Sequence, residues 1–394
     1  MVDVGGVNEL EKIIKQINRY CDVSYHKIYP EELEKYEELE DETINFFLEK
    51  KGIKLYSHQS IAISKTLDGK NVCIATPTAS GKTLCYHIPI IKSLIENKNS
   101  KAILIYPLKA LAQDQKKKLT ENLEIISPFF TCDIYDGDTK QGKRDKIKKN
   151  IPNCILTNPD MLHYGLLPHH YLWEELFSNL KYLVVDEVHT YRGVFGSNVA
   201  WILGRLKRIA KFYGSSPQII ATSATVGNPK EFLSNLFDED FEIITERGDY
   251  SSERHFIIIN PEEDESAYRL ASKIFTDSIK LGLRTIVFTK ARKITELIYS
   301  FFARSSSKLA NKVSSYRAGY LPEERREIEK KLFEGDLLGV ISTSALELGI
   351  DIGNLDVCIL VGYPGSIINT LQRSGRVGRG RRPSPKEMPW TSFL

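Results

Sequence analysis

The chain has 394 residues, of which 42% are hydrophobic, and a formal net charge of +3. That length provides for roughly two or three compact domains, and the composition is that of an ordinary globular protein. No apolar run approaches the roughly 20 residues that a membrane-spanning helix needs, so we expect no membrane insertion.

The N-terminus and the cysteines indicate where such a protein works. The first residues, MVDVGGVNELEKIIKQ, have neither the cationic nor the apolar region of a secretory signal. The 6 cysteines lie far apart and never as Cys-x-x-Cys, which is typical of reduced thiols and argues against a structural zinc site within this chain. We therefore expect a cytoplasmic protein.

Residues 1–50 differ from the rest because they contain an acidic, Glu-rich stretch, PEELEKYEELEDETINFFLEKK. This stretch favours a helix but shows little apolar face before Ile44. We predict a small, peripheral N-terminal helical extension, with a partner-binding segment as the alternative.

Short β-rich runs alternate with longer helix-compatible stretches through residues 51–247. The runs are NVCIAT, AILIYP, CILTN, YLVVDE and QIIATSA, and their alternation predicts a parallel sheet with helices on both faces. A polar, turn-rich segment, ERGDYSSERH, follows, and a second series (FIIIN, RTIVFT, LLGVIST and DVCILVG) occupies residues 252–394. We therefore predict two α/β domains joined by a linker.

The stretch NVCIATPTASGKTLCYHIPII has the order strand, tight loop, helix. Backbone N–H groups of such a loop converge with the helix N-terminus on negative charge, so the loop can hold nucleotide phosphates. Lys82 would reach the β- and γ-phosphates, and the Thr83 hydroxyl would ligate Mg²⁺. Thr76 replaces the first glycine of the usual pattern, so an ordinary strand-to-helix turn remains the alternative.

A second half of the site is predicted about a hundred residues downstream. The run KYLVVDEVHTY is an apolar strand that ends in two carboxylates, Asp186 and Glu187. Asp186 can hold Mg²⁺, and Glu187 can polarise the water that attacks the γ-phosphate. Carboxylates at a strand end can also mark a solvated turn, but the upstream phosphate loop favours the catalytic interpretation.

From about Leu55 to Gly380 the order of motifs resembles the DEAD/DEAH-box helicases of superfamily 2. The motifs, from the Q-type motif through motifs I, Ia, Ib, II, III, IV, V and VI, are LYSHQ, ATPTASGKT, YPLKALAQDQ, TNPDML, DEVH, TSAT, TIVFTKAR, STSALELGIDIG and QRSGRVGRG. The resemblance implies a fold of the α/β class with two tandem RecA-like parallel-sheet domains. It also implies ATP hydrolysis at a site shared by both domains and coupled to stepping along nucleic acid.

Within the superfamily, the wording of the motifs is most similar to the mitomycin repair factor A branch, which is related to RecQ4-like fungal helicases. The stretches DEVHTYRGVFGSNVAWILGRL and GYPGSIINTLQRSGRVGRG carry this similarity. It implies 3′ to 5′ movement on single-stranded DNA, with ATP and Mg²⁺ as cofactors and a role in DNA repair. The alternatives are an RNA-remodelling ATPase and a non-catalytic, truncated nucleic-acid-binding product. We expect a monomer and cannot name a protein partner.

The resemblance assigns roles to residues of the nucleotide site. Gln59 would read the adenine, Gln372 would sense the γ-phosphate, and Arg376 and Arg379 would act as arginine fingers, a role that suits their permanent charge. The residues expected to bind the nucleotide are Tyr56, Gln59, Thr78, Ala79, Ser80, Gly81, Lys82, Thr83, Leu84, Gly349 and Asp351. The residues expected to couple the ATP and nucleic-acid sites are His189, Ser223 and Thr225.

Nucleic acid is expected along the side where motifs Ia, Ib, IV and V emerge. The candidates are small, polar or backbone-exposing residues that suit phosphate contacts without sequence preference, with turns and helix caps as the alternative. They are Pro107, Leu108, Lys109, Gly137, Thr157, Thr289 and Thr343. Tyr164, Trp173 and Trp201 have the residue type to stack on a base, but their helical spacing favours the core.

After Gly380 the chain departs from the family pattern. It continues as RRPSPKEMPWTSFL, whereas the resembling branch continues into a region with four zinc-binding cysteines. We therefore expect an incomplete second domain, which puts strand separation in doubt.

Overall fold

The computed structural model describes residues 5–224, 228–317, 319–346, 353, 355–378 and 390–393. The chain forms two compact units, one of Lys35–Gly248 and one that combines Met1–Glu34 with Asp249–Leu394. Each unit is built on its own seven-stranded sheet, as expected for tandem RecA-like domains. Within the described parts of the chain, no helix combines the length and apolar character that crossing a bilayer requires.

The unit Lys35–Gly248 contains a parallel sheet of strand order β4-β5-β3-β6-β7-β2-β8. Its strands are β2 (Val72–Ile74), β3 (Lys101–Ile105), β4 (Cys132–Ile134), β5 (Cys154–Thr157), β6 (Leu180–Val185), β7 (Gln218–Thr222) and β8 (Glu242–Ile244). Its helices are α2 (Glu42–Lys51), α3 (Ser57–Leu67), α4 (Lys82–Glu96), α5 (Lys109–Glu124), α6 (Gln141–Lys149), α7 (Pro159–Met161), α8 (Glu174–Ser178), α9 (Gly193–Phe212) and α10 (Pro229–Phe237). Short helical turns lie at η1 (Leu162–Leu166), η2 (Leu167–Trp173) and η3 (Val188–Thr190).

Helices cover both faces of this sheet because its strands are apolar on both sides. In β3 all five residues are buried; Ile103 and Ile105 join the core under α9 and α10, while Ala102 and Leu104 join the core under α3 and α4. Successive residues of a strand point to opposite faces, so a continuous apolar run can fill two cores. This explains why the short β-rich runs of the sequence lack polar alternation.

The second unit has the strand order β1-β9-β14-β13-β10-β12-β11, and among its described strands only the β1–β9 pair is antiparallel. Its strands are β1 (Asp22–Tyr29), β9 (Arg254–Asn260), β10 (Thr285–Phe288), β11 (Val313–Tyr316), β12 (Gly339–Ser342), β13 (Val357–Leu360) and β14 (Trp390–Phe393). Its helical elements are α1 (Gly5–Tyr20), α11 (Ala267–Lys280), α12 (Arg292–Ser305), η4 (Ser307–Lys312), α13 (Pro322–Glu334), η5 (Ser344–Leu346) and α14 (Ile367–Ser374). Strand β14 was not expected from the sequence.

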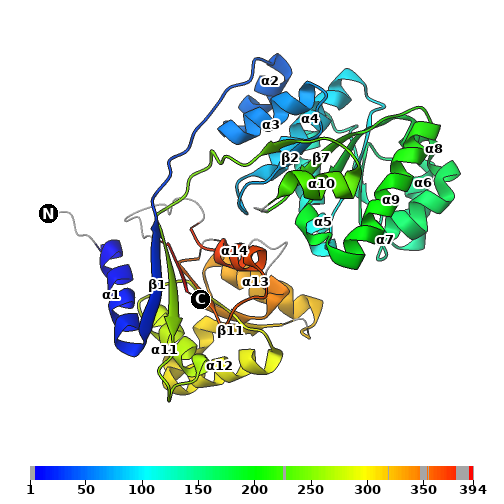
Figure 1. The fold of residues 1–394 in the computed structure, drawn as a ribbon. Helices are drawn as coiled ribbons and strands as arrows, with labels where there is room; N and C mark the ends of the chain where they lie inside the picture. Colours follow the sequence, from blue (N-terminus) through cyan, green and yellow to red (C-terminus); the bar gives the residue numbers. More distant parts are fainter. Residues whose placement is uncertain are drawn as a thin grey trace. The chain divides into compact units, whose positions relative to one another are not determined.

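The predicted extension over residues 1–50 needs correction. A short N-terminal helix is present, but α1 lies beside β1 (Figure 1), and its Ile13 and Ile17 are packed in the same core as α11. Strand β1 extends the second sheet by pairing with β9. These elements therefore belong to the second unit and are not a peripheral appendage.

The acidic stretch is also less helical than expected. Helix α2 begins only at Glu42, because the Asp41 carboxylate accepts a hydrogen bond from the Ile44 N–H at 3.0 Å and caps the helix there. Its buried residues, including Phe47, pack into the core of the unit Lys35–Gly248. The segment 1–50 is thus divided between the two units.

Candidate nucleotide site and nucleic-acid track

The loop between β2 and α4 turns sharply at two residues with left-handed backbone. Gly81, the N-cap of α4, has φ of +78°, and Ala79 has φ of +66°. Glycine adopts this conformation freely, whereas for alanine it costs about 1–2 kcal/mol. Strain of this kind collects at ligand-binding loops, where the surrounding structure enforces it. Inside the loop, the hydroxyls of Thr76 and Ser80 are 2.6 Å apart.

Lys82 directs its positive charge onto this loop. Its Nζ donates to the carbonyl oxygens of Thr76 at 2.9 Å and Pro77 at 2.8 Å. The ammonium group therefore lies over the concave side of the loop, as expected for a lysine that contacts phosphate.

Helix α3 is joined to the same loop by two buried side chains. The Gln59 amide donates to the Gly81 carbonyl at 2.9 Å, and its oxygen accepts from the Tyr56 N–H at 2.9 Å. His58 accepts from the Gly248 N–H on Nδ1 at 3.0 Å, which leaves Nε2 to donate to the Ser80 carbonyl at 2.8 Å. Gln59 thus holds the loop, and His58, which the sequence did not indicate, does the same.

Tyr56, expected to stack on adenine, lies in an aromatic group next to this junction. Its ring stacks on Tyr36 at a centroid distance of 5.3 Å and on His58 at 5.9 Å. Tyr36 is the more exposed of these rings and was not among the predicted residues. A stack of exposed and half-buried rings beside a phosphate loop is a suitable surface for a base.

Gly81→Ala should weaken ATP binding about tenfold or more, because alanine is strained at a left-handed φ and its methyl group would clash with the Gln59 side chain. A Cβ at Gly81 would lie 2.5 Å from Gln59 Nε2, at a φ of +78°. The test is titration with a fluorescent ATP analogue, alongside thermal unfolding.

Gly69→Ala is the matched control for this substitution. Gly69 has a similar φ of +79°, but a Cβ at this position would meet nothing within 4 Å, so its replacement should lower stability without changing ATP affinity. Equal ATP affinity for the Gly81→Ala and wild-type chains would show that the close fit between Gly81 and Gln59 is unimportant.

The carboxylates at the end of β6 sit next to the end of β7. The Thr222 hydroxyl donates to the Asp186 carboxylate and accepts from the Glu187 N–H at 3.1 Å. Burial and the neighbouring Glu187 raise the pKa of Asp186 above its ordinary value, against the opposing effects of Thr222 and Lys82. A divalent cation would favour the deprotonated form, and the oxygens of Thr83 and Asp186 are ligands that Mg²⁺ prefers.

Glu187 has a left-handed φ of +52°, a strained conformation for a non-glycine residue. His189 Nδ1 accepts from the Ala224 N–H at 3.1 Å and lies 3.3 Å from a Glu187 oxygen. Burial, helped by Lys82 and Arg192, lowers the pKa of His189 to about 3. His189 is therefore neutral with its proton on Nε2, and its contact with Glu187 is not an ion pair.

The structure brings two of the predicted coupling residues together. Ser223 Oγ lies 3.5 Å from His189 Nδ1, so the segment after β7 contacts the segment after β6. Thr225, the third coupling residue, lies outside the described residues.

In the second unit, Gln372 on α14 and Arg376 just after it are both buried. Between them, the Arg373 guanidinium lies over the Phe288 ring at 5.4 Å, which fixes this segment against β10. Arg379, Gly349 and Asp351 lie outside the described residues, so their roles stay predictions.

Four of the residues predicted for the nucleic-acid track lie in the unit Lys35–Gly248, three of them around the start of α5 and one in the loop after β4. Pro107 and Leu108 precede α5, and Leu108 is its exposed N-cap. Lys109 Nζ pairs with Asp138 at 2.6 Å, and a Cβ placed on Gly137 would lie 3.6 Å from the same Nζ. Lys109 and Gly137, from separate motifs, are therefore neighbours.

The predicted threonines are placed differently. Thr157 is buried, and its hydroxyl donates to the Tyr135 carbonyl at 2.7 Å. Thr289 is also buried, with its hydroxyl 2.8 Å from that of Thr295 and its N–H bonded to the Ser342 carbonyl. That bond places Thr289 beside Thr343, which is partly exposed. The hydroxyls of Thr157 and Thr289 are thus bonded within the fold, and contacts of these two residues with nucleic acid stay predictions.

The three aromatic residues that we assigned to the core differ from one another in how buried they are. Trp173 is completely buried and packs edge-on against Tyr135 at 4.9 Å, as expected. Tyr164 and Trp201 are each 73% exposed, so the core assignment is wrong for both.

Comparison with known proteins gives two matching family models. They are DEAD/DEAH box helicase over residues 56–232 and Helicase conserved C-terminal domain over residues 267–381. The ATP-dependent helicase YprA of Bacillus subtilis is 44% identical over 369 residues, which are 91% of this chain and 49% of that protein. The chain thus spans about half the length of this relative.

Solved structures of the DUF1998 helicase MrfA are similar to this chain. One, bound to DNA, has a TM-score of 0.90 and 40% identity, and the match covers 98% of this chain and 52% of that one. Another, bound to DNA and AMPPNP, has a TM-score of 0.89 and 41% identity, with 97% and 55% covered.

Proposed function

Because the chain belongs to the DEAD/DEAH-box helicases of superfamily 2, we propose that it is the motor core of an ATP-dependent helicase. It would move 3′ to 5′ on single-stranded DNA and act in DNA repair. The similarity to MrfA, whose structures are bound to DNA and AMPPNP, supports the nucleotide and the DNA. The direction of movement and the role in repair rest on the resemblance of the motifs alone.

One observation carries the proposal: a phosphate loop with its lysine and a carboxylate pair lie at the same edge of one sheet. Lys82 follows β2 and Asp186 follows β6, and β7 joins these strands through the bond from Thr222 to Asp186. Ligands of open parallel sheets bind at the carboxyl ends of the strands, because the loops there converge.

The residues divide the work of hydrolysis between them. The loop N–H groups and Lys82 would hold the phosphates and stabilise the charge that develops on them. Thr83 and Asp186 would hold Mg²⁺, which neutralises the β- and γ-phosphate oxygens. Glu187 would orient and polarise the attacking water, and Arg376 would add positive charge to the transition state.

Neutral His189 can link hydrolysis to the nucleic acid. Its Nδ1 lies 3.3 Å from a Glu187 oxygen and also accepts from the N–H of Ala224, next to Ser223, so a shift at the carboxylate would reach the segment after β7 through this one ring nitrogen. Because a neutral imidazole has no charge to lose between pH 5 and 8, we expect this link to be independent of pH in that range.

Lys82→Ala should lower steady-state ATP hydrolysis about 10²–10³-fold, because it removes a preorganised positive charge from the phosphates. The rate would be measured alone, with single-stranded DNA and with single-stranded RNA of the same sequence. Lys65→Ala, which removes an exposed lysine from α3, is the matched control and should leave the rate unchanged. Wild-type hydrolysis by Lys82→Ala would refute the site.

The two nucleic acids separate the proposal from its rivals. Stronger stimulation by DNA supports the proposed motor, and stronger stimulation by RNA indicates an RNA-remodelling ATPase. ATP binding without hydrolysis under any of these conditions would indicate a non-catalytic nucleic-acid-binding core.

A further inference from the structure

The outer face of α9 carries aromatic and basic side chains that the proposed motor does not use. Four buried apolar residues of this helix that face the sheet follow the spacing i, i+4, i+7, i+11: Val199, Leu203, Leu206 and Ala210. Residues two positions further on are rotated by about 200° on a helix of 3.6 residues per turn. These residues, which we call the α9 stripe, are Trp201, Arg205, Arg208 and Phe212.

The α9 stripe is positively charged, and three of its four residues are exposed, Arg205 being half-buried. Trp201 is 73% and Phe212 75% exposed, although burial of such rings is strongly favourable. Helix α9 contains no acidic residue. Among the described residues, Arg208 has no ion-pair partner. A helix face that only contacts solvent is usually polar, so two large exposed rings on this face indicate a surface that binds a ligand or partner.

Neighbouring residues hold the stripe in place. His170 meets the Phe212 ring edge-on at 6.2 Å, and Tyr213 meets it at 5.0 Å. Arg205 donates to His163 Nδ1 at 3.1 Å.

A hollow of about 390 Å³ lies over this part of the stripe, within the range of about 300–1,000 Å³ that is typical of ligand sites. The residues that line it are His170, Arg205, Arg208, Ile209 and Phe212.

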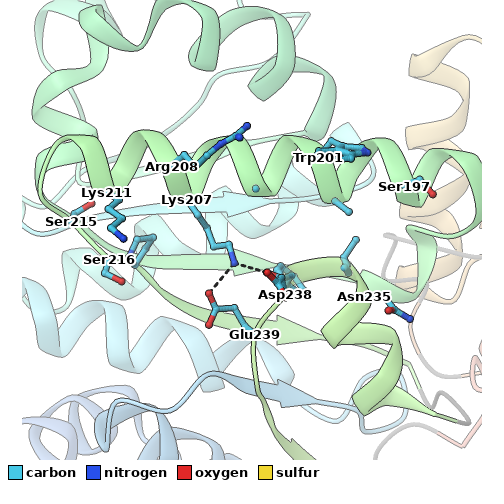
Figure 2. Close-up of a pocket in the computed structure, with 15 residues that line it drawn as sticks. Ser197, Trp201, Lys207, Arg208, Lys211, Ser215, Ser216, Asn235, Asp238 and Glu239 are labelled. Carbon is cyan, nitrogen blue, oxygen red and sulfur yellow. Dashed lines mark hydrogen bonds and ion pairs between the residues drawn. The ribbon is translucent and has the colours of Figure 1, made fainter.

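The opposite flank of α9 is different. There Lys207 donates to the Phe237 carbonyl and pairs with Glu239 at 2.8 Å. A larger groove of about 800 Å³ lies beside this pair; Asp238 and Lys211 line it, and it reaches the edge of the stripe at Trp201 and Arg208. Figure 2 shows Lys207 reaching toward Glu239, while Arg208 extends away from these carboxylates. The charge of Lys207 is thus compensated, and that of Arg208 is available to a ligand.

We propose that the α9 stripe is a second binding surface for single-stranded nucleic acid. Trp201 and Phe212 would stack on bases, because every base has a flat π-face, and Arg205 and Arg208 would contact phosphates. An acidic peptide would satisfy the charges but has no planar group for the two rings. The alternation of rings and cations along one stripe therefore favours nucleic acid.

The stripe is separate from the proposed motor track. The track residues of this unit lie at the carboxyl ends of β3, β4 and β5, whereas α9 runs back toward the amino end of β7, which begins at Gln218. Only a strand longer than the track would reach both surfaces. Short strands therefore report on the track, and the additional affinity of long strands reports on the stripe.

The experiment measures the binding of fluorescein-labelled oligo-dT to the 394-residue chain by anisotropy at several salt concentrations. One oligonucleotide has about 10 nucleotides, within the range of single-strand site sizes, and the other is about four times as long. Trp201→Ala should weaken binding of the long strand about 5- to 150-fold and leave the short strand unchanged. Trp201→Phe should retain most of the affinity.

Charge variants give an independent readout. Arg208→Gln should flatten the slope of log K against log salt for the long strand by about 0.7 for each phosphate that the variant no longer neutralises. Lys207→Gln is the matched control on the same helix and should leave this slope unchanged, because Lys207 is already paired with Glu239.

Three outcomes would overturn the proposal. The first is an unchanged long-strand affinity in a Trp201→Ala chain with wild-type thermal unfolding. The second is a wild-type chain that binds the long strand no more tightly than the short one. The third is a Trp201→Ala effect on binding of polyglutamate but not of DNA, which would assign the stripe to an acidic protein partner. Failure to bind the short strand would instead count against the motor track.

Discussion

A chain carrying Glu187→Gln should bind ATP normally but hydrolyse it about 10²–10⁴-fold more slowly, the usual contribution of a positioned general base. Glutamine has the shape of glutamate, and the backbone hydrogen bond from residue 187 to Thr222 does not depend on the side chain. The substitution therefore removes the negative charge that polarises water and leaves the phosphate loop unchanged. Steady-state hydrolysis and titration with a fluorescent ATP analogue give the two quantities.

A matched control separates this effect from a general loss of negative charge. Glu121→Gln changes an exposed glutamate on α5 in the same unit and should leave both hydrolysis and ATP binding unaltered. Hydrolysis at the wild-type rate by the Glu187→Gln chain would show that the Glu187 carboxylate does not take part in the hydrolysis reaction. Loss of ATP binding together with hydrolysis would mean that Glu187 supports the loop instead.

The strands and the phosphate loop could be predicted because local sequence determines them. The run of β3 is apolar throughout most of its length and is buried on both faces, so its pattern indicates a central strand whatever surrounds it. The turn from β2 into α4 depends on Gly81 and the residues next to it. The carboxylates after β6 follow from the general position of ligands in parallel sheets.

His58 could not be predicted in the same way. Its ring joins Ser80, 22 residues away, to Gly248, 190 residues away. Neither separation leaves a periodic signal in the sequence, and a lone histidine on a helix most often has a structural role. Only the folded unit shows that this residue supports the phosphate loop.

The N-terminal strand was missed for a related reason. Seven of the eight residues of β1 are exposed, so no alternation of apolar and polar residues marks it. Its conformation comes from pairing with β9, with Asp22 opposite Asn260 and Tyr29 opposite Arg254. A strand that forms by pairing with another strand, and not by burying an apolar face, cannot be detected from hydrophobic periodicity.

Trp201 shows a third limit of prediction from sequence. Helix α9 has apolar residues on more than one face, and the sequence alone does not say which face meets the sheet. The face of Leu203 and Leu206 does so, which leaves Trp201 in solvent. The misassigned residue is the one that leads to the proposed second surface.

Arg376→Ala should lower nucleic-acid-stimulated hydrolysis about 10³–10⁵-fold, the range observed when an arginine finger is lost, and should change ATP affinity only a few-fold. Arginine is permanently charged and forks onto two oxygens, so it stabilises the transition state more than the ground state. Rates at saturating ATP and single-stranded DNA, compared with ATP binding, test this difference directly.

Since Arg376 is buried, its removal can also act through stability, and two further variants separate the causes. Arg376→Lys keeps the charge but loses the fork, so a finger role predicts a rate that stays at least about tenfold below wild type while thermal unfolding is restored. Arg304→Ala removes an exposed arginine from α12 and should change neither quantity.

A rate that recovers fully in Arg376→Lys along with the unfolding temperature would show that Arg376 only supports the fold around α14. A rate that stays low in a stably folded chain would mean that the guanidinium acts on the phosphates.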